Sequence, residues 1–399
     1  TRSILHNHSF KETGIMNANW NYPTAIRVGP GRLSELPNVC QEAGISAPLL
    51  VTDPGLATLP MVENAIIGCR DAGLRCELFS NIKPNPTGQN VEDGVQAYVE
   101  GQHDGVIAFG GGSGIDAAKA VALMAHQSVS IWELEDVGDN WTRANGELIA
   151  PIVALPTTAG TGAEVGRASV ILDESSETKK IIFHPKMLPQ IVILDPELTV
   201  GLPAALTAAT GMDAFSHSLE AWSSPLFHPM AEGIAAEGIR LVREYLPRAV
   251  RDGADIEART QMLVASSMGA TSFQRGLGAI HALAHPLGAL YDAHHGTLNA
   301  VLMPYVLKAN RSAVESRIER LGRYIGLSDT GFDSFMDWVL SLRAEINLPS
   351  TLSELGIDDQ QSHRIGQMAV QDPSAGTNPI TYSAEDYERI FLSALTGQL

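Results

Sequence analysis

The sequence is poor in cysteine, in basic residues and in long apolar runs. It has 3 cysteines, too few and too irregularly spaced for a disulfide framework or a CxxC metal site. No stretch reaches the about 18 uncharged apolar residues that a membrane-spanning helix needs. Its 27 basic residues are outnumbered by 45 acidic ones, and the net charge of −18 repels phosphate backbones and anionic lipids. These shortages predict a cytoplasmic protein, in a reducing setting, that binds neither nucleic acid nor a membrane.

Length and composition predict a folded chain of more than one domain. The chain has 399 residues, of which 44% are hydrophobic and 18% charged, so it holds enough apolar material for a sizeable core. Residues 1–19 are polar and irregular and lack the basic-then-apolar order of a signal peptide, so we expect an N-terminal extension there. The remainder is expected to divide into an α/β domain over 20–196 and an all-helical domain over 197–399.

Short apolar runs alternate with amphipathic stretches in the first half, a pattern typical of a parallel α/β sheet. The expected strands are 48–52, 75–79, 105–109, 152–155 and 191–194. In the second half, apolar residues recur at helical spacing and β-branched runs are scarce. The expected helices are 205–222, 230–244, 255–271, 279–287, 313–325 and 331–345. A crevice between the two halves is the expected place for a ligand.

A glycine-rich turn joins the strand 105–109 to the next helix. It reads Gly110-Gly111-Gly112-Ser113-Gly114-Ile115-Asp116. Without side chains, backbone N–H groups at a helix N-terminus can approach a phosphate. Ser113 and Asp116 have the spacing of a capping box that would start this helix. The dinucleotide fingerprint that the turn matches is weak alone, and a tight turn that needs glycine only for its dihedral angles is the alternative.

A second turn of small residues follows the strand 152–155 and strengthens the prediction of a nucleotide site. It reads Leu155-Pro156-Thr157-Thr158-Ala159-Gly160-Thr161-Gly162. Turns at the carboxyl ends of neighbouring strands form the ligand crevice of open α/β sheets. Asp53 ends an earlier strand, where its carboxylate would bind the adenosine ribose and repel the 2′-phosphate of NADP. Equally open is the alternative that Asp53 only starts an Asp-Pro-Gly turn.

Histidines and one carboxylate gather in the helical half at metal-ligand spacing. Asp213 and His217 lie four residues apart, as do His281 and His285, so each pair occupies one face of a helix. His295 follows on what we expect to be a loop. Burying a carboxylate and several imidazoles among apolar residues is costly unless they are paired or bind a metal. These nitrogen and oxygen donors suit Fe²⁺, Zn²⁺, Mn²⁺ or Co²⁺, and the HExxH motif of zinc hydrolases is absent.

Four motifs occur in a fixed order along the chain. They are Gly110-Gly111-Gly112-Ser113-x-x-Asp116-x-x-Lys119, Pro156-Thr157-Thr158-Ala159-Gly160-Thr161-Gly162-x-Glu164-Val165, Gly211-Met212-Asp213-Ala214-x-x-His217, and His281-x-x-x-His285-Pro286-Leu287-Gly288 followed by His295-Gly296. Together they resemble the iron-containing (group III) alcohol dehydrogenase family, from about Trp20 to Ala394. The resemblance implies a Rossmann-like dinucleotide-binding domain, an all-α metal-binding domain of the dehydroquinate synthase-like fold, and catalysis between them.

The resemblance implies a role for each matching residue. Asp213, His217, His281 and His295 would hold the metal, which is iron or alternatively zinc. His281 and His285 would be catalytic, with His285 near the reacting oxygen. The residues implied for the cofactor, NAD rather than NADP, are Asp53, Asn85, Gly110, Gly111, Gly112, Ser113, Asp116, Thr157, Thr158, Thr161, Lys179 and Lys180.

The chain departs from the family pattern at three places. Gly166-Arg167 stands where many members have threonine. His294 precedes the last metal ligand where proline is common, and would compete for metal or act as a base. A cation in Phe273-Gln274-Arg275 resembles members that act on ω-hydroxy acids such as 4-hydroxybutyrate. Phe273, Arg275 and His294 are therefore the substrate candidates, and a surface or interdomain salt bridge is the alternative role of Arg275.

The combined prediction is an NAD-dependent, iron-dependent alcohol dehydrogenase that interconverts a primary alcohol and its aldehyde by hydride transfer. The alternatives are a 4-hydroxybutyrate-type dehydrogenase acting on an anionic semialdehyde, a metal-dependent lyase like 3-dehydroquinate synthase, and a non-catalytic binding module. The lyase needs several basic residues around its substrate, and few lie near the histidines. The family also implies a homo-oligomer, commonly a dimer.

Overall fold

The computed structural model describes residues 24–176 and 178–399, so the predicted extension over 1–19 lies outside the described residues. Six parallel strands form one sheet in the order β1-β8-β5-β4-β2-β3. Their bounds are β1 Ala25–Val28, β2 Pro48–Val51, β3 Glu77–Phe79, β4 Gly105–Gly110, β5 Ile152–Pro156 and β8 Ile191–Leu194. The strand order reverses between β2 and β4, which are neighbours, and open α/β sheets bind ligands at such a switch point.

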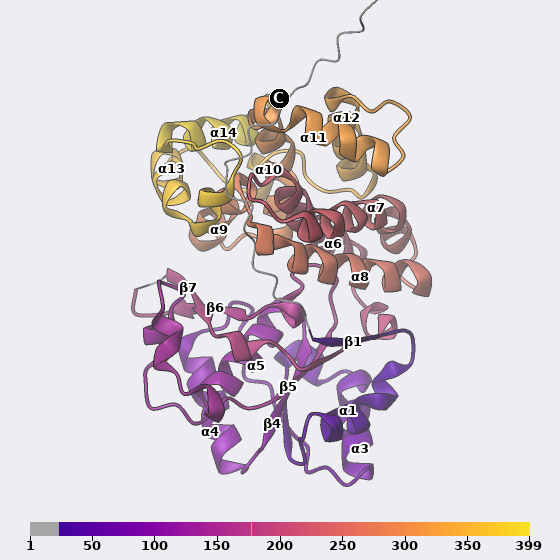
Figure 1. Cartoon of the computed structure of the whole chain (residues 1–399), viewed down its shortest axis with the longest axis vertical. Coiled ribbons are helices and arrows are strands. Elements are labelled where there is room, and N and C mark those ends of the chain that lie inside the picture. The colour runs from indigo at the N-terminus through magenta and orange to yellow at the C-terminus, as the bar shows by residue number, and fades with distance from the viewer. Residues whose placement is uncertain (1–23, 177) are drawn as a thin grey trace, which may run out of the picture.

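Helices cover both faces of this sheet (Figure 1). They are α1 Leu36–Glu42, α2 Pro54–Ala57, α3 Pro60–Asp71, α4 Gly88–Glu100 and α5 Gly112–Met124. Alternate residues of β2 enter different cores, since Leu49 and Val51 pack with α4 and α5 whereas Leu50 packs with α1 and α3. Burial on both faces explains why these strands are continuous apolar runs, the pattern that predicted them.

The second half consists of helices joined by loops, and its described residues form no strand. Its helices are α6 Ala204–Ser223, α7 Pro229–Arg251, α8 Ile256–Ser272, α9 Ala279–Tyr291, α10 His295–Ala309, α11 Arg311–Tyr324, α12 Phe332–Glu345, α13 Ser362–Gln371 and α14 Ala384–Thr396. They enclose a single core. Nowhere in the described chain does a helix combine the length and apolar character required to cross a membrane. The predicted fold class, a parallel α/β half followed by a helical half, is confirmed.

Several elements differ from the sequence-based prediction. His295, expected on a loop, is the first residue of α10. Helix α10 escapes prediction because residues 298–307 are all buried, so it has no polar stripe of helical period. The antiparallel hairpin of β6 Ala168–Asp173 and β7 Thr178–Phe183 packs against α5, and neither of its strands was expected. The edge strand β1 and the helices α13 and α14 are also absent from the prediction.

The two halves meet along α8, at the second small-residue turn and at an exposed contact. The Ser267 hydroxyl on α8 donates to Oε1 of Glu164 at 2.7 Å, a buried bond between the halves. At the exposed contact, the Asn85 amide donates to Oδ1 of Asp292 at 3.1 Å. The α/β half and the helical half are therefore in direct contact (Figure 1).

Candidate metal and cofactor site

Helix α6 carries two of the predicted metal ligands on one face. The side chains of Asp213 and His217 are 4% and 7% exposed. Glycines let the neighbouring helices come close to this face. A Cβ atom at Gly269 of α8 would lie 2.9 Å from the Ala214 oxygen, and one at Gly296 of α10 would lie 2.2 Å from the oxygen of Ala209. The glycine after His295 therefore allows α10 to begin against α6.

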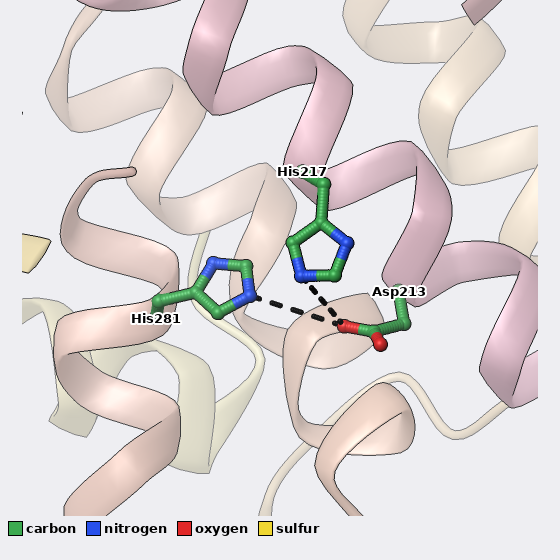
Figure 2. A group of neighbouring side chains, drawn as sticks. All are labelled: Asp213, His217 and His281. Carbon is green, nitrogen blue, oxygen red and sulfur yellow. Dashed lines mark ion pairs between the residues drawn. The ribbon is translucent and has the colours of Figure 1, made fainter. Parts of the chain in front are cut away.

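Three imidazoles from α6, α9 and α10 direct their Nε2 atoms at Oδ1 of Asp213. The distances are 3.7 Å from His217, 3.9 Å from His281 and 3.6 Å from His295. Figure 2 shows Asp213 with the first two of these histidines. Such separations exceed a hydrogen bond but approach the about 3.4 Å between donors that share a tetrahedral ion with bonds of about 2.1 Å. Asp213, His217 and His281 form a group whose donor atoms all lie within 4.8 Å of one another.

The protonation states of His217, His295 and Asp213 fit a divalent cation. Burial lowers the pKa of His217 to about 4 and the pKa of His295 well below the ordinary 6.5, so both are neutral near pH 7. Burial acts to raise the pKa of Asp213, but the surrounding imidazoles and an amide lower it below its ordinary value. Neutral imidazoles beside a carboxylate are the forms that bind metal. The residues present therefore fit an iron or zinc ion by donor type, spacing and charge.

Two carboxylates that the sequence analysis did not single out orient the histidines of α9. Glu220 accepts a hydrogen bond through Oε2 from Nδ1 of His281 at 2.6 Å. Asp372 accepts one through Oδ2 from Nδ1 of His285 at 2.8 Å. Glu220 could have been found from its spacing, since it follows Asp213 by seven residues on the same helix face. No local pattern connects Asp372 with His285, because the fold brings them together from distant parts of the chain.

Asn299 is a third residue that the sequence analysis did not single out, and it contacts the predicted metal ligands through its side-chain amide. Its Nδ2 donates to Oδ1 of Asp213 at 2.8 Å and lies 3.3 Å from Nε2 of His281 and 3.2 Å from Nε2 of His295. Asn299 follows His295 by one helical turn, a spacing that becomes informative only once α10 is known to be a helix.

His285 lies beside the predicted metal ligands Asp213, His217, His281 and His295 rather than among them. Its ring stacks on the ring of His295, with centroids 5.5 Å apart and planes 10° apart. Its side chain is 38% exposed, whereas that of His281 is 2% exposed. An imidazole in contact with both a ligand and solvent can carry a proton between them.

The glycine-rich turn leads directly into α5, as predicted. The helix begins at Gly112, and its N-cap Gly111 makes no side-chain capping hydrogen bond. The first backbone N–H groups of α5 therefore have no side-chain cap, which is the arrangement of an anion-binding helix N-terminus.

The predicted capping box at this turn is wrong. The Ser113 hydroxyl donates to the carbonyl oxygen of Pro84. The Asp116 carboxylate lies 3.2 Å from the Lys119 ammonium and accepts the Val170 N–H at 3.0 Å. Asp116 therefore fastens α5 to β6, a strand of the hairpin that the prediction had missed.

The two turns pack against each other. The contacting pairs are Gly110 with Thr157, Gly111 with Thr158, and Gly112 with Thr161. A Cβ atom at Gly112 would lie 2.7 Å from Cγ2 of Thr161, so a side chain there would push the turns apart. The second turn also packs against α6, because a Cβ atom at Gly160 would lie 2.8 Å from Cβ of Thr210 on that helix. Contacts thus run from the cofactor turns to the helix that carries Asp213.

Asp53 caps the short helix α2. Its Oδ1 accepts the backbone N–H of Leu56 at 3.0 Å. It lies close to the glycine-rich turn, since a Cβ atom at Gly114 would be 4.0 Å from the Asp53 nitrogen. Asp53 therefore has a structural role as the cap of α2, and its role in the preference for NAD over NADP stays a prediction.

The predicted cofactor lysines lie on β7. Lys180 forms an ion pair with Asp173 at 3.0 Å, and its ammonium is 5.5 Å from the centre of the Trp132 ring. Lys179 precedes it, and successive strand residues point to opposite faces of the hairpin. Since Lys180 already has partners on its own face, Lys179 is the stronger candidate of the two.

Arg275 does not supply a cation for the substrate, and that prediction is wrong. Its side chain is 1% exposed and lies 2.8 Å from Glu232. It also donates to the carbonyl oxygens of Leu226 at 2.7 Å and Trp222 at 3.2 Å. A salt bridge is observed, but it is buried within the helical half and lies neither at the surface nor between the domains. The guanidinium is enclosed because its turn, Phe273–Arg275, packs against α6 and α7.

The other two substrate candidates lie near the metal-binding group. The ring of Phe273 is 5.2 Å from that of His217 and inclined by 65°. His294 is exposed at the N-cap of α10, where its Nδ1 lies 3.4 Å from Oγ1 of Thr297. Phe273 is thus in position to limit the size of a substrate, and its role stays a prediction, as does that of His294.

Comparison with known proteins defines the class to which this fold and site belong. The iron-containing alcohol dehydrogenase model matches residues 23–196, and the C-terminal model of the Fe-containing alcohol dehydrogenase family matches residues 207–395. The chain therefore belongs to the iron-containing alcohol dehydrogenase family. It is an oxidoreductase that acts on CH–OH groups.

Particular relatives are similar over almost their whole length. The 4-hydroxybutyrate dehydrogenase of Cupriavidus necator is 39% identical, over 92% of this chain and 97% of the relative. The NAD-dependent methanol dehydrogenase of Bacillus methanolicus is 32% identical, over 94% and 100%. The crystal structure of a 1,3-propanediol oxidoreductase has a TM-score of 0.90 at 33% identity, over 95% of this chain and 100% of the other. At the level of the family, the predicted enzyme class and cofactors are confirmed, which favours a dehydrogenase over a lyase.

Proposed function

We propose that this protein interconverts a primary alcohol and its aldehyde, with NAD and a ferrous ion bound where its two halves touch. The proposal rests on the packing of Gly160 against Thr210, because Thr210 precedes Asp213 by about one turn of α6. A nucleotide on the two small-residue turns would therefore lie beside the metal-binding group.

Each half contributes its own part of the site. Asp213, His217, His281 and His295 would hold the iron, which zinc could replace on the same donors. When bound, the iron supplies Lewis acidity at the substrate oxygen and NAD supplies the hydride acceptor. The backbone of the glycine-rich turn would bind the pyrophosphate, and the threonines of the second turn would contact the nicotinamide ribose. The threonines concerned are Thr157, Thr158 and Thr161.

His285 carries the alcohol proton toward solvent. Asp372 can only accept a hydrogen bond, so the neutral ring of His285 holds its proton on Nδ1. The lone pair is then on Nε2, which is able to take a proton. Asp372 also stabilises the cation that forms, because its carboxylate stays 2.8 Å from the ring.

An ω-hydroxy acid is the second candidate substrate. Its support is the 39% identity with the 4-hydroxybutyrate dehydrogenase of Cupriavidus necator. Because Arg275 is enclosed, another group would have to bind the carboxylate, and Lys179 is the candidate. This candidate would be selected by a kcat/KM for 4-hydroxybutyrate well above that for 1-butanol. The ratio of the two values should also fall in Lys179→Ala.

The proposal also includes the cellular compartment and the oligomeric state of the protein. The three cysteines are free thiols, which supports a reducing compartment such as the cytoplasm. The family resemblance supports a homo-oligomer, commonly a dimer.

Replacing one ligand tests the proposed function. We expect His281→Ala to lose both bound iron and NADH formation from alcohols, because the other donors cannot retain the ion. Elemental analysis of the purified protein and an absorbance assay at one alcohol concentration measure the two losses. His363→Ala, which changes an exposed histidine paired with Glu388, is the control and should keep both. A His281→Ala protein that retains iron and full activity would refute the proposal.

A further inference from the structure

We propose that Glu220 is a positioning residue that sets the metal affinity of this site by orienting His281. The inference rests on the metal site proposed above. Glu220 lies on α6, the helix of Asp213 and His217, and is only 5% exposed. Its two carboxylate oxygens both bind groups of α9. Oε2 accepts from Nδ1 of His281 and Oε1 accepts from the backbone N–H of Ile280, each at 2.6 Å.

The first of these contacts determines which nitrogen of His281 can bind a metal. A carboxylate accepts hydrogen bonds and donates none, so the contact requires a proton on Nδ1. The lone pair is then on Nε2, the atom that faces Oδ1 of Asp213 at 3.9 Å. A carboxylate partner of this kind fixes the orientation of the ring and raises its basicity as a ligand.

The second contact holds Glu220 itself in place at the start of α9. The N-cap Gly278 makes no side-chain capping hydrogen bond, so other residues must accept the first N–H groups. Glu220 accepts that of Ile280, and Oδ1 of Asn378 accepts that of Ala279 at 3.1 Å. A Cβ atom at Gly278 would lie 3.0 Å from Oε1 of Glu220, so glycine makes room for the carboxylate. The helix dipole also favours a negative charge at this end.

Charge balance supports the same role. The buried group holds two carboxylates, Asp213 as a metal donor and Glu220 beside the donors, and their ionised forms supply two negative charges. Two charges match those of a divalent cation, so the pair lowers the cost of burying the metal. Glu220 thus connects the two helices that supply His217 and His281, and it contributes to metal binding without being a ligand.

The experiment compares two acceptors at the start of α9, only one of which contacts His281. Metal-free full-length wild type, Glu220→Gln and Asn378→Ala are titrated with Co²⁺, using its visible absorption and competition with a chromophoric chelator to obtain Kd. Thermal unfolding of the metal-free proteins is measured in parallel. We expect Glu220→Gln to raise the Kd by about 10–100-fold. Asn378→Ala should lower Tm and leave the Kd within about threefold of wild type, because it removes a cap without touching a ligand.

A second substitution keeps the test decisive if Glu220→Gln folds poorly. Glu220→Asp retains the charge with a shorter reach, and we expect its Kd to lie between those of wild type and Glu220→Gln. Equal Co²⁺ affinity in wild type and the Glu220 variants overturns this inference alone. Equal weakening in Asn378→Ala and Glu220→Gln also overturns it, since the effect would then come from the helix end. A wild-type protein that binds no Co²⁺ overturns the proposed function itself.

Discussion

The two halves of the molecule build their parts of the site in opposite ways. In the α/β half, most of the predicted binding groups are backbone atoms and small side chains from two short turns at the ends of β4 and β5. In the helical half, they are ionisable side chains from three helices whose sequence positions span from Asp213 to His295. A site made of backbone depends on local turn geometry. A site made of side chains depends on how closely whole helices pack, which is why glycines such as Gly269 and Gly296 occur there.

The difference extends to how each half tolerates charge. Several buried ionisable groups of the helical half satisfy one another, as His281 and Glu220 do at 2.6 Å. In the α/β half, the buried ammonium of Lys119 mainly serves backbone, since it donates to the carbonyl oxygens of Ala163 and Ala168. Substitutions in the helical half should therefore affect stability or metal binding, and those in the turns should affect the cofactor.

Among the substitutions that test the difference between the two halves, Arg275→Ala should have the largest effect. We expect Arg275→Ala to lower the free energy of unfolding by about 3 kcal/mol, because it empties a buried ion-pair site. Urea unfolding of the metal-free protein measures the loss. Arg320→Ala removes a more exposed partner of the same Glu232, and should lose less than about 1 kcal/mol. If Arg275→Ala instead unfolds like wild type and lowers kcat/KM for 4-hydroxybutyrate relative to 1-butanol, Arg275 reaches the substrate after all.

A medium effect is expected in the glycine-rich turn. In Gly112→Ala, the added Cβ would meet Thr161 at 2.7 Å and displace the second turn. We expect the KM for NAD to rise by about tenfold, which corresponds to about 1.4 kcal/mol of overpacking. Iron content should stay unchanged, because no metal ligand moves. Gly68→Ala, on α3 where an added Cβ has no neighbour within 4 Å, is the matched control. Loss of iron in Gly112→Ala would show that the two halves are not independent.

The smallest effect is expected at Asp53. Asparagine caps a helix as well as aspartate does, so Asp53→Asn should keep the wild-type Tm while removing the charge. We expect the ratio of kcat/KM for NADP to that for NAD to rise several-fold, because a 2′-phosphate is no longer repelled. Asp53→Ala, which also removes the cap, should lose about 1 kcal/mol of stability. An unchanged cofactor ratio in Asp53→Asn would mean that this residue only caps α2.

Local patterns in the sequence predict most of the α/β half and several helices correctly. The strands β2, β4, β5 and β8 stand out because a strand buried on both faces is a short apolar run between turns. Helix α10 does not, because a helix buried all round has no amphipathic period. The hairpin β6–β7 and the edge strand β1 are missed because exposed strands mix polar and apolar residues.

The residues of the candidate site also divide into those that local patterns predict and those that they do not. Asp213, His217 and His281 are recognisable because paired ligands repeat at one helical turn, and the structure brings them together. Asp372 and Asn378 are not recognisable, because their partners His285 and Ala279 lie about 90 to 100 positions earlier in the chain. The partners of Arg275 were equally hidden, which is why its charge was wrongly assigned to the substrate.

The contacts between the halves also bear on how a dinucleotide could enter and leave. Glu164 and Ser267 are joined by a buried bond, whereas Asn85 and Asp292 share an exposed one that competes with water. An exposed hydrogen bond contributes only about 1 kcal/mol, so thermal motion breaks it readily. We therefore expect the molecule to hinge about the Glu164 contact and to part first at Asn85. In that motion α6 moves as one rigid rod, and the metal donors that it carries keep their mutual spacing through each turnover.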